Sequence, residues 1–165
     1  MKQDEKTFTE IVKKYQQPLY RYIRRMVIRH EDSEDILQET FVKAFRHLWQ
    51  IRSESALQAW LYKIATNETR RHLRRHAAEI LLDGEGTEAP VHPSEEPGLD
   101  ARKADSVTIP ATLQRLSPLE REVFCLRYYD DLDYEQICRI TGATKNTLMV
   151  SWHSAKEKIK KELFQ

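Results

Sequence analysis

Apolar residues recur at intervals of three and four along most of this chain, which is the spacing of an amphipathic α-helix. Only 4 of its 165 residues are glycine, so few positions would interrupt a helix, and the 40% hydrophobic content is enough for real cores. The first such pattern covers residues 8–27, and the second covers residues 36–49, with Asp32 or Ser33 as its predicted N-cap. We therefore predict an all-α fold.

The charge of the chain changes sign along its length. Residues 1–76 carry 16 Lys/Arg against 10 Asp/Glu, residues 77–110 carry 2 against 8, and residues 111–165 carry 9 against 8. The formal net charge of +1 therefore hides a basic block followed by an acidic one. Such a basic block favours a polyanionic partner.

The composition of the acidic segment, residues 79–110, predicts a linker. Residues 79–110 hold three of the four glycines and four of the six prolines, and they contain few large apolar side chains. A segment of this composition cannot bury enough surface to fold alone. We predict two small helical domains, at residues 1–78 and 111–165, joined by an acidic flexible linker at residues 79–110.

The second domain carries the start and stop signals of a helix-turn-helix. Two capping boxes, a left-handed stop and a further N-cap mark its predicted helix ends, namely Ser117 with Glu120, Asp133 with Gln136, Gly142, and Thr144. The helix that follows Thr144 has an inward stripe of Leu148, Trp152, Ala155 and Ile159. Its outward residues are Lys145, Asn146, Met149, Val150, His153 and Lys156.

The third helical pattern of the first domain begins apolar and ends basic. Leu57, Trp60, Leu61, Ile64 and Ala65 form one stripe, and we expect the core to end near Ala65. The stripe then continues with the polar residues Glu68, Arg71, His72 and Arg75.

Beside that stripe lies a basic face. Its side chains fall within an arc of about 140° on a helix, and they are Lys63, Asn67, Arg70, Arg71, Arg74 and Arg75. Guanidinium groups in a row suit a phosphate backbone, and an amide among them can read a base edge. The alternative is an ordinary solvated face, but the helix-turn-helix elsewhere in the chain favours nucleic acid.

Two further features of the first domain leave alternatives open. Asp35, Gln38 and Glu39 fall along a polar flank of the second helix, which could simply be solvated. Trp49 and Trp60 bracket a polar loop, where exposed aromatic rings could stack on unpaired bases. Burial of both rings in the core is the more common outcome.

Neither a metal site nor an enzyme is indicated. His72 and His76 have the spacing of a ligand pair, but no clear third ligand is near, and the surrounding arginines would repel a cation. The sequence contains no HExxH, glycine-rich phosphate loop or GxSxG. We expect no cofactor, no metal and no enzymatic activity.

Cys125 and Cys138 sit at apolar helical positions, where a thiol acts as a small hydrophobe, so we expect no disulfide. No apolar run approaches the roughly 18 residues of a membrane span, and the N-terminus has no signal-peptide core. We therefore expect a cytoplasmic protein.

Together, three segments resemble the extracytoplasmic-function (ECF) sigma factors of bacteria. SEDILQETFVKAF is similar to the segment of that family that binds core RNA polymerase. WLYKIATNETRRHLRR is similar to its minus-10 recognition helix, and LSPLEREVFCLRYYDDLDYEQICRITG is similar to its second domain. The resemblance implies a sigma factor that binds core polymerase, directs it to a promoter and helps to melt the minus-10 element.

The resemblance also implies roles for particular residues. It assigns Asp35, Gln38 and Glu39 to the clamp helices of the largest polymerase subunit, and the second domain to the flap of the second-largest subunit. It assigns the loop from Arg52 and Ser53 to Leu57 to capture of a flipped base. The implied minus-10 contacts are Lys63, Asn67, Arg70, Arg71 and Arg74, and the implied minus-35 contacts are Thr144, Lys145, Asn146, Met149, Val150 and His153. The family commonly has an anti-sigma factor as a further partner.

The last helix departs from the family pattern. Where the family usually has a basic pattern such as GTVKSRLxRAR, this chain has NTLMVSWHSAK. Met149, Val150, Ser151 and Ser154 replace the expected Lys, Ser, Arg and Arg. Two other functions would use some of the same features, namely a helix-turn-helix repressor or activator on a duplex operator, and a helical adaptor whose basic face meets an acidic protein.

Overall fold

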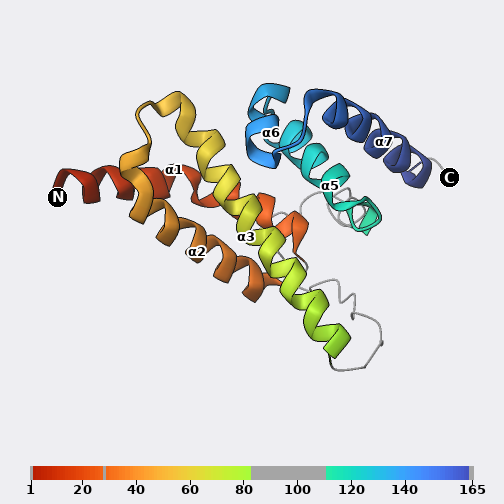
Figure 1. The fold of residues 1–165 in the computed structure, drawn as a ribbon, viewed down its shortest axis with the longest axis horizontal. Helices are drawn as coiled ribbons and strands as arrows, with labels where there is room; N and C mark the ends of the chain where they lie inside the picture. The colour runs from red at the N-terminus through yellow and green to blue at the C-terminus, as the bar shows by residue number, and fades with distance from the viewer. Residues whose placement is uncertain (1, 28, 83–110, 164–165) are drawn as a thin grey trace. The chain divides into compact units, whose positions relative to one another are not determined.

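The computed structural model describes residues 2–27, 29–82 and 111–163, and every regular element in these ranges is helical (Figure 1). The chain divides into two compact units, Met1–Pro93 and Ser94–Gln165. The predicted all-α fold is therefore confirmed for the described residues. Most of the predicted linker, residues 83–110, lies outside them.

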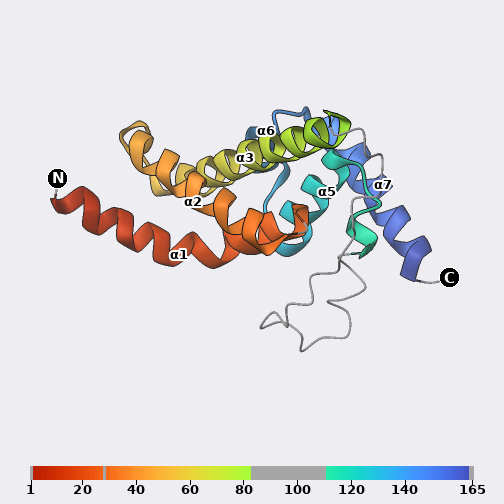
Figure 2. The same cartoon turned by 90° about the horizontal axis from the view of Figure 1, so that it is seen from below.

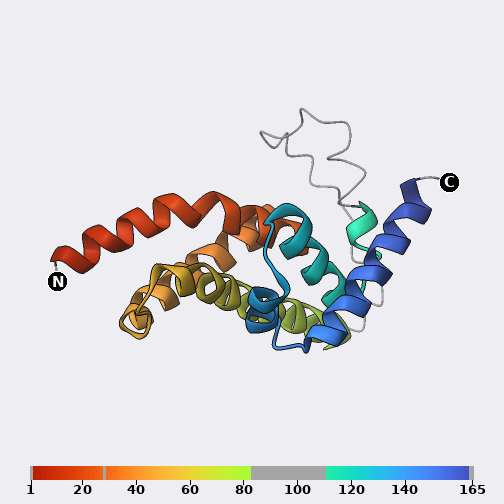
Figure 3. The ribbon, with the colours of Figure 1, turned by 90° about the horizontal axis from the view of Figure 1, so that it is seen from above.

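The first unit is built from three long helices. They are α1 (Lys2–Met26), α2 (His30–His47) and α3 (Glu54–Leu82), with a short 3₁₀ turn, η1 (Leu48–Gln50), after α2. Each of the three helices contacts the other two, and they run side by side in two views (Figures 2 and 3). The fully buried side chains of this core include Leu19, Tyr22, Ile23, Leu61 and Tyr62.

The core of this unit extends further along α3 than the sequence predicted. Thr66 and Thr69 are almost fully buried, so the expected end of the core near Ala65 is wrong by about one turn. Both buried hydroxyls have hydrogen-bond partners. Thr66 Oγ1 lies 2.7 Å from the hydroxyl of Tyr22, and Thr69 Oγ1 donates to the carbonyl of Ala65 at 2.8 Å.

The predicted N-cap of α2 is also wrong. Neither Asp32 nor Ser33 caps the helix, because α2 begins at His30 with Arg29 at the N-cap and no side-chain cap bond. Ser33 already lies in the first turn, where its backbone N–H and its hydroxyl both donate to the carbonyl of Arg29, each at 3.0 Å. At its far end α3 continues to Leu82, so residues 79–82 are helical although they were expected in the linker.

The second unit contains α5 (Pro118–Phe124), a π-helical turn η2 (Cys125–Tyr129), α6 (Tyr134–Thr141) and α7 (Lys145–Leu163). Both predicted capping boxes are present, Ser117 with Glu120 at α5 and Asp133 with Gln136 at α6. Cys125 is buried and Cys138 half-buried, and both are free thiols, as predicted.

The turn between α6 and α7 has the predicted helix-turn-helix geometry. Gly142 ends α6 in the left-handed region, with φ of 78°, which a residue without a Cβ adopts at little cost. Thr144 then caps α7, since its Oγ1 accepts the backbone N–H of Thr147 at 3.3 Å. Leu148 and Ala155 are fully buried on the inner side of α7.

A buried carboxylate joins α5 to α7. Glu120 accepts hydrogen bonds from Ser154, from Lys158 at 2.7 Å and from the backbone N–H of Ser117 at 2.9 Å. Burial by itself raises the pKa of Glu120, but the hydrogen bonds from Lys158, Ser154 and Ser117 outweigh it and lower the pKa from 4.5 to about 2. This carboxylate is therefore charged in the folded unit and anchors α7 at its middle.

Candidate polymerase and nucleic-acid interface

The polar flank predicted on α2 is exposed. Asp35, Gln38 and Glu39 all reach solvent, at i, i+3 and i+4 of one helix face. They are held there because Ile36, Thr40 and Ala44, on another face of the same helix, are buried against the rest of the unit.

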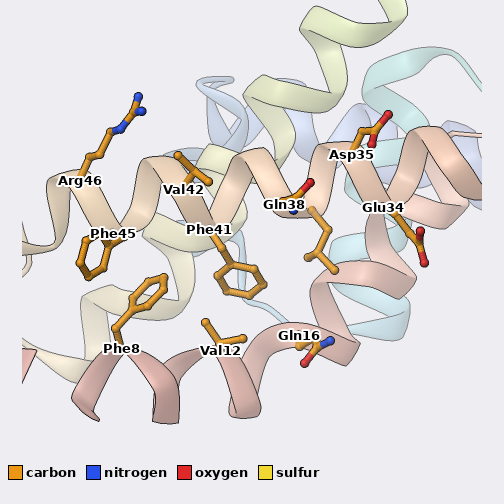
Figure 4. A pocket seen from close by; sticks show the side chains of 11 residues that line it. Phe8, Val12, Gln16, Glu34, Asp35, Gln38, Phe41, Val42, Phe45 and Arg46 are labelled. Carbon is orange, nitrogen blue, oxygen red and sulfur yellow. The ribbon is translucent and has the colours of Figure 1, made fainter. Parts of the chain in front are cut away.

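An apolar groove runs between α1 and α2, with a volume of about 620 Å³ (Figure 4). Its floor contains three phenylalanines in edge contact, Phe8 with Phe41 at 6.2 Å and Phe8 with Phe45 at 5.0 Å between ring centres. Asp35 and Gln38 lie on its rim. The three phenylalanines fall within the helical patterns predicted at residues 8–27 and 36–49, but the groove was not predicted. The i, i+4 spacing of Phe41 and Phe45 on α2 could have indicated it.

A second groove, of about 350 Å³, lies between α2 and α3. We call it the mixed-charge groove, because Asp35 and Glu39 line it from α2, while Arg71 and Arg75 line it from α3. Glu68 and His72 also line it, so the polar continuation of the α3 stripe forms a groove wall.

Two of the side chains that line this groove, His72 and Glu68, have partners within the unit. His72 Nε2 lies 3.5 Å from Asp32 Oδ2, and Lys43 pairs with Glu68. The ammonium group of Lys43, on α2, is therefore paired with a carboxylate of α3 in the same unit. Asp35 and Glu39 form no ion pair with a described residue, which leaves these two carboxylates available to a partner.

The basic face of α3 is largely as predicted. Lys63, Asn67, Arg71, Arg74 and Arg75 are exposed, whereas Arg70 is half-buried and has a contact within the unit. On an ideal helix Lys63, Asn67, Arg70 and Arg74 fall within about 60° of one another and make one row. Arg71 and Arg75 lie beside this row, toward the mixed-charge groove.

The connection from α2 to α3 places the remaining predicted residues at the start of the same helix. Arg52 and Ser53 are both exposed and directly precede α3. At about 1.5 Å per residue, Glu54 and Asn67 lie about 20 Å apart along the helix axis. The loop and the basic row therefore mark two ends of one extended surface.

The two tryptophans that bracket this connection differ. Trp60 is half-buried on α3, in agreement with a core role, whereas Trp49 in η1 is 76% exposed. The common expectation that both rings are buried is therefore wrong for Trp49.

The outward face of α7 is also as predicted. Thr144, Lys145, Asn146, Met149, Val150 and His153 are all exposed. Lys156 lies over the ring of Trp152, with its Nζ 5.2 Å from the ring centre, and Arg127 approaches the same ring at 5.3 Å. On the inward side of α7, Trp152 stacks on Phe124 of α5 at 5.7 Å between ring centres.

Among the described residues there is no group of three or more His, Cys, Asp and Glu that could hold a metal ion. His72 and His76 stack at 6.4 Å between ring centres. Within residues 2–27, 29–82 and 111–163, no helix is both long and apolar enough to cross a bilayer.

Two family models match the chain, Sigma-70 region 2 over residues 11–79 and Sigma-70, region 4 over residues 106–159. The chain is 31% identical to the ECF RNA polymerase sigma-E factor of Haemophilus influenzae, over 97% of this chain and 89% of that protein. It is 30% identical to the RNA polymerase sigma-H factor of Pseudomonas aeruginosa, over 97% of this chain and 88% of that protein.

The fold is similar to that of the sigma factor RpoE of Bartonella quintana, which was solved in complex with the anti-sigma factor NepR. The TM-score is 0.79 and the identity 25%, over 96% of this chain and 97% of that one. A region 2 followed by a region 4 defines a sigma factor, the class of protein that brings RNA polymerase to promoters.

The chain belongs to the ECF branch of the sigma-70 family, and it directs promoter-specific initiation of transcription by RNA polymerase. This membership confirms the family resemblance and decides against a repressor or activator that acts without polymerase. It also means that the chain is not an enzyme in its own right.

Proposed function

We propose that Asp35, Gln38 and Glu39 of α2 dock on the clamp helices of the largest polymerase subunit. The observation that carries this proposal is their joint exposure on one helix face, beside the rim of the apolar groove. Carboxylates next to an apolar floor suit a helical partner that offers both arginines and apolar side chains. The flap of the second-largest subunit would then bind the second unit.

For promoter DNA, we propose that Arg52 and Ser53 hold a flipped base while Lys63, Asn67, Arg70, Arg71 and Arg74 follow the minus-10 backbone. The separation of about 20 Å between the loop and Asn67 matches roughly six nucleotides at about 3.4 Å each. One extended surface could therefore contact a whole minus-10 element. The exposed residues of α7, from Thr144 to His153, would meet the minus-35 element in the major groove.

We also propose that an anti-sigma factor binds this chain and blocks polymerase docking, as the resemblance to a sigma factor solved with one suggests. The protein would act in the cytoplasm, where core polymerase and promoters meet. An anti-sigma factor that binds without displacing core polymerase would contradict this regulatory role.

The test of the docking surface is charge reversal at α2. Asp35→Lys and Glu39→Lys should each weaken association with core polymerase about tenfold or more, because a lysine would face arginines on the partner. Glu10→Lys is the matched control, since Glu10 is exposed on α1 at the helical position opposite Phe8 and the groove. Association is measured by titration with core polymerase. The promoters are identified by sequencing transcripts made in vitro from genomic DNA.

Normal association of both α2 variants would move the docking surface elsewhere. Circular dichroism should show unchanged helix content in all three variants, since each substituted residue is exposed.

A further inference from the structure

A single carboxylate interrupts the basic part of α3. Residues 55–78 of this helix carry five lysines and arginines but only one acidic residue, Glu68. The side chain of Glu68 is 11% exposed, and it lines the mixed-charge groove together with Arg71 and Arg75. A carboxylate in this place competes with DNA phosphates for the same arginines.

The position of Glu68 on α3 makes it a competitor for Arg71 in particular. Side chains at i and i+3 of a helix are neighbours, and a carboxylate and a cation at this spacing can form an ion pair. Arg71 stands three residues after Glu68. In the structure, however, Arg71 is exposed and forms no ion pair with any described residue. Its guanidinium therefore remains available to a phosphate.

Lys43 accounts for this arrangement. It lies on α2, which runs beside α3 (Figure 2), and its ammonium group pairs with the carboxylate of Glu68. Its side chain is 31% exposed, so the pair is partly shielded from water, where charges attract each other more strongly than at a fully exposed site. Removing the lysine alone would leave a largely buried carboxylate without a partner, which is costly. Arg71 is the nearest cation on the same helix face that could replace it.

The exposed carboxylates of the groove compete less strongly for Arg71. Asp35 and Glu39 line the groove from α2, but both are solvated, and exposed ion pairs contribute little. The pairing of Glu68 therefore decides whether Arg71 is free.

We propose that Lys43 is a positioning residue for DNA binding. By pairing with Glu68, it keeps Arg71 free to contact a phosphate. The proposal rests on the proposed contact of Arg71 with the minus-10 backbone. It gives a residue of α2, the helix proposed to dock on polymerase, a role in DNA binding that requires no contact of its own with DNA.

The test replaces Lys43 in the full-length chain and measures affinity for a short fluorescein-labelled DNA duplex at several salt concentrations. Methionine keeps an apolar stem but cannot pair with Glu68. Lys43→Met should therefore lose about three- to tenfold in affinity at low salt, with a log-log salt slope lower by about one phosphate contact. Lys43→Arg can still pair with Glu68 and should stay within about twofold of the unchanged chain. Urea unfolding confirms that each variant is folded under the assay conditions.

Removing the competing carboxylate should rescue the variant. Lys43→Met combined with Glu68→Gln should bind DNA within about twofold of Glu68→Gln alone, because no carboxylate is left to capture Arg71. Lys13→Met is the matched control, since Lys13 is exposed on α1 and forms no ion pair with a described residue. Glu68→Gln should raise the affinity of Lys13→Met by no more than it raises that of the unchanged chain.

A background with Arg71→Ala distinguishes positioning from a general loss of structure. With alanine at position 71, Lys43→Met should cost no more affinity than Lys13→Met does, because the arginine it would misplace is absent. A lysine that only held α2 against α3 would cost the same affinity with either residue at position 71.

An equal cost in both backgrounds would overturn the proposal, as would a Lys43→Met chain that binds DNA normally or that Glu68→Gln does not rescue. Arg71→Ala by itself tests the proposed function. If it leaves the DNA affinity of the chain unchanged, the proposed backbone contact of Arg71 is wrong, and the role of Lys43 falls with it. If Arg71→Ala weakens binding and Lys43→Met does not, only the role of Lys43 is wrong.

Discussion

Glu120 shows how one side chain can fix a recognition helix. It is 7% exposed, yet it is charged, because Ser117, Ser154 and Lys158 bind its carboxylate. Since Ser154 and Lys158 lie on α7, the orientation of that helix depends on a residue of α5. Sequence reasoning identified Glu120 only as half of a capping box.

We predict that Glu120→Gln destabilises the second unit by about 1–3 kcal/mol, because the amide nitrogen would face the ammonium of Lys158. The pKa of Glu120 is depressed on folding, so its contribution is complete above about pH 4.5 and is lost as the pH falls toward about 2. Urea unfolding at a series of pH values measures this difference.

Glu135→Gln is the control for this experiment, because Glu135 pairs with Arg139 at an exposed site of α6, 3.1 Å apart. It should change the free energy of unfolding by less than about 0.5 kcal/mol. A difference between Glu120→Gln and the unchanged chain that persists at the lowest pH would contradict the assigned charge.

At the scale of elements, α7 offers little charge to a phosphate backbone. Its outward face exposes Met149 and Val150, at 47% and 70%, where the family usually has polar and basic residues. Lys156 is drawn over Trp152. The start of the helix, with Asn146 and its free backbone donors, should therefore supply much of the minus-35 contact.

We predict that Met149→Lys with Val150→Lys raises affinity for duplex DNA and steepens its salt dependence by up to about one unit of log-log slope per new phosphate contact. Asn146→Ala should remove footprint protection at the minus-35 element only, with melting near minus 10 preserved. Titrations at several salt concentrations and footprinting of the polymerase complex measure these effects. If neither variant differs from the unchanged chain, α7 does not lie in the major groove of the DNA.

The helices themselves show what a sequence can predict. Capping boxes, Gly142 and Thr144 were predictable because each depends on residues within four positions of one another. Asn67 and the arginines of α3 were predictable as a face because helical spacing fixes their direction. Their spacing did not predict that Arg70 is half-buried.

Features set by packing between helices were not predictable in this way. Thr66 is buried because Tyr22, 44 residues earlier, lies against it, and α2 begins early without a side-chain cap. The exposure of Trp49 depends on where η1 leaves the bundle. Local patterns could not show the burial of Thr66, since it is decided by a residue distant in the sequence.

For the first unit as a whole, the mixed-charge groove places carboxylates proposed to bind polymerase opposite arginines on the side of the helix proposed to bind DNA. Asp35 and Glu39 face the groove from one side, and Arg71 and Arg75 face it from the other. In the free protein these carboxylates reduce the positive potential that DNA would meet. The effect is moderate, because solvent-exposed charge pairs contribute a net free energy of only about 0–1 kcal/mol.

We predict that Asp35→Asn with Glu39→Asn raises the affinity of the free chain for duplex DNA about two- to fivefold at low salt. The gain should disappear at high salt, where exposed charges are screened. Glu10→Gln, which removes a carboxylate from α1, should have a smaller effect. The α2 change removes two charges and Glu10→Gln removes one, so an equal gain per charge removed would show that net charge matters rather than the groove.

The same groove carries a thermodynamic consequence for the order of assembly. If core polymerase covers Asp35 and Glu39, it removes their repulsion of DNA phosphates and strengthens DNA binding at Arg71 and Arg75. Coupling between two ligands is reciprocal, so DNA already bound at the arginines must strengthen polymerase docking by the same factor. Because these two carboxylates lie opposite two arginines, promoter DNA and polymerase would each raise the affinity of the chain for the other, in whichever order they bind.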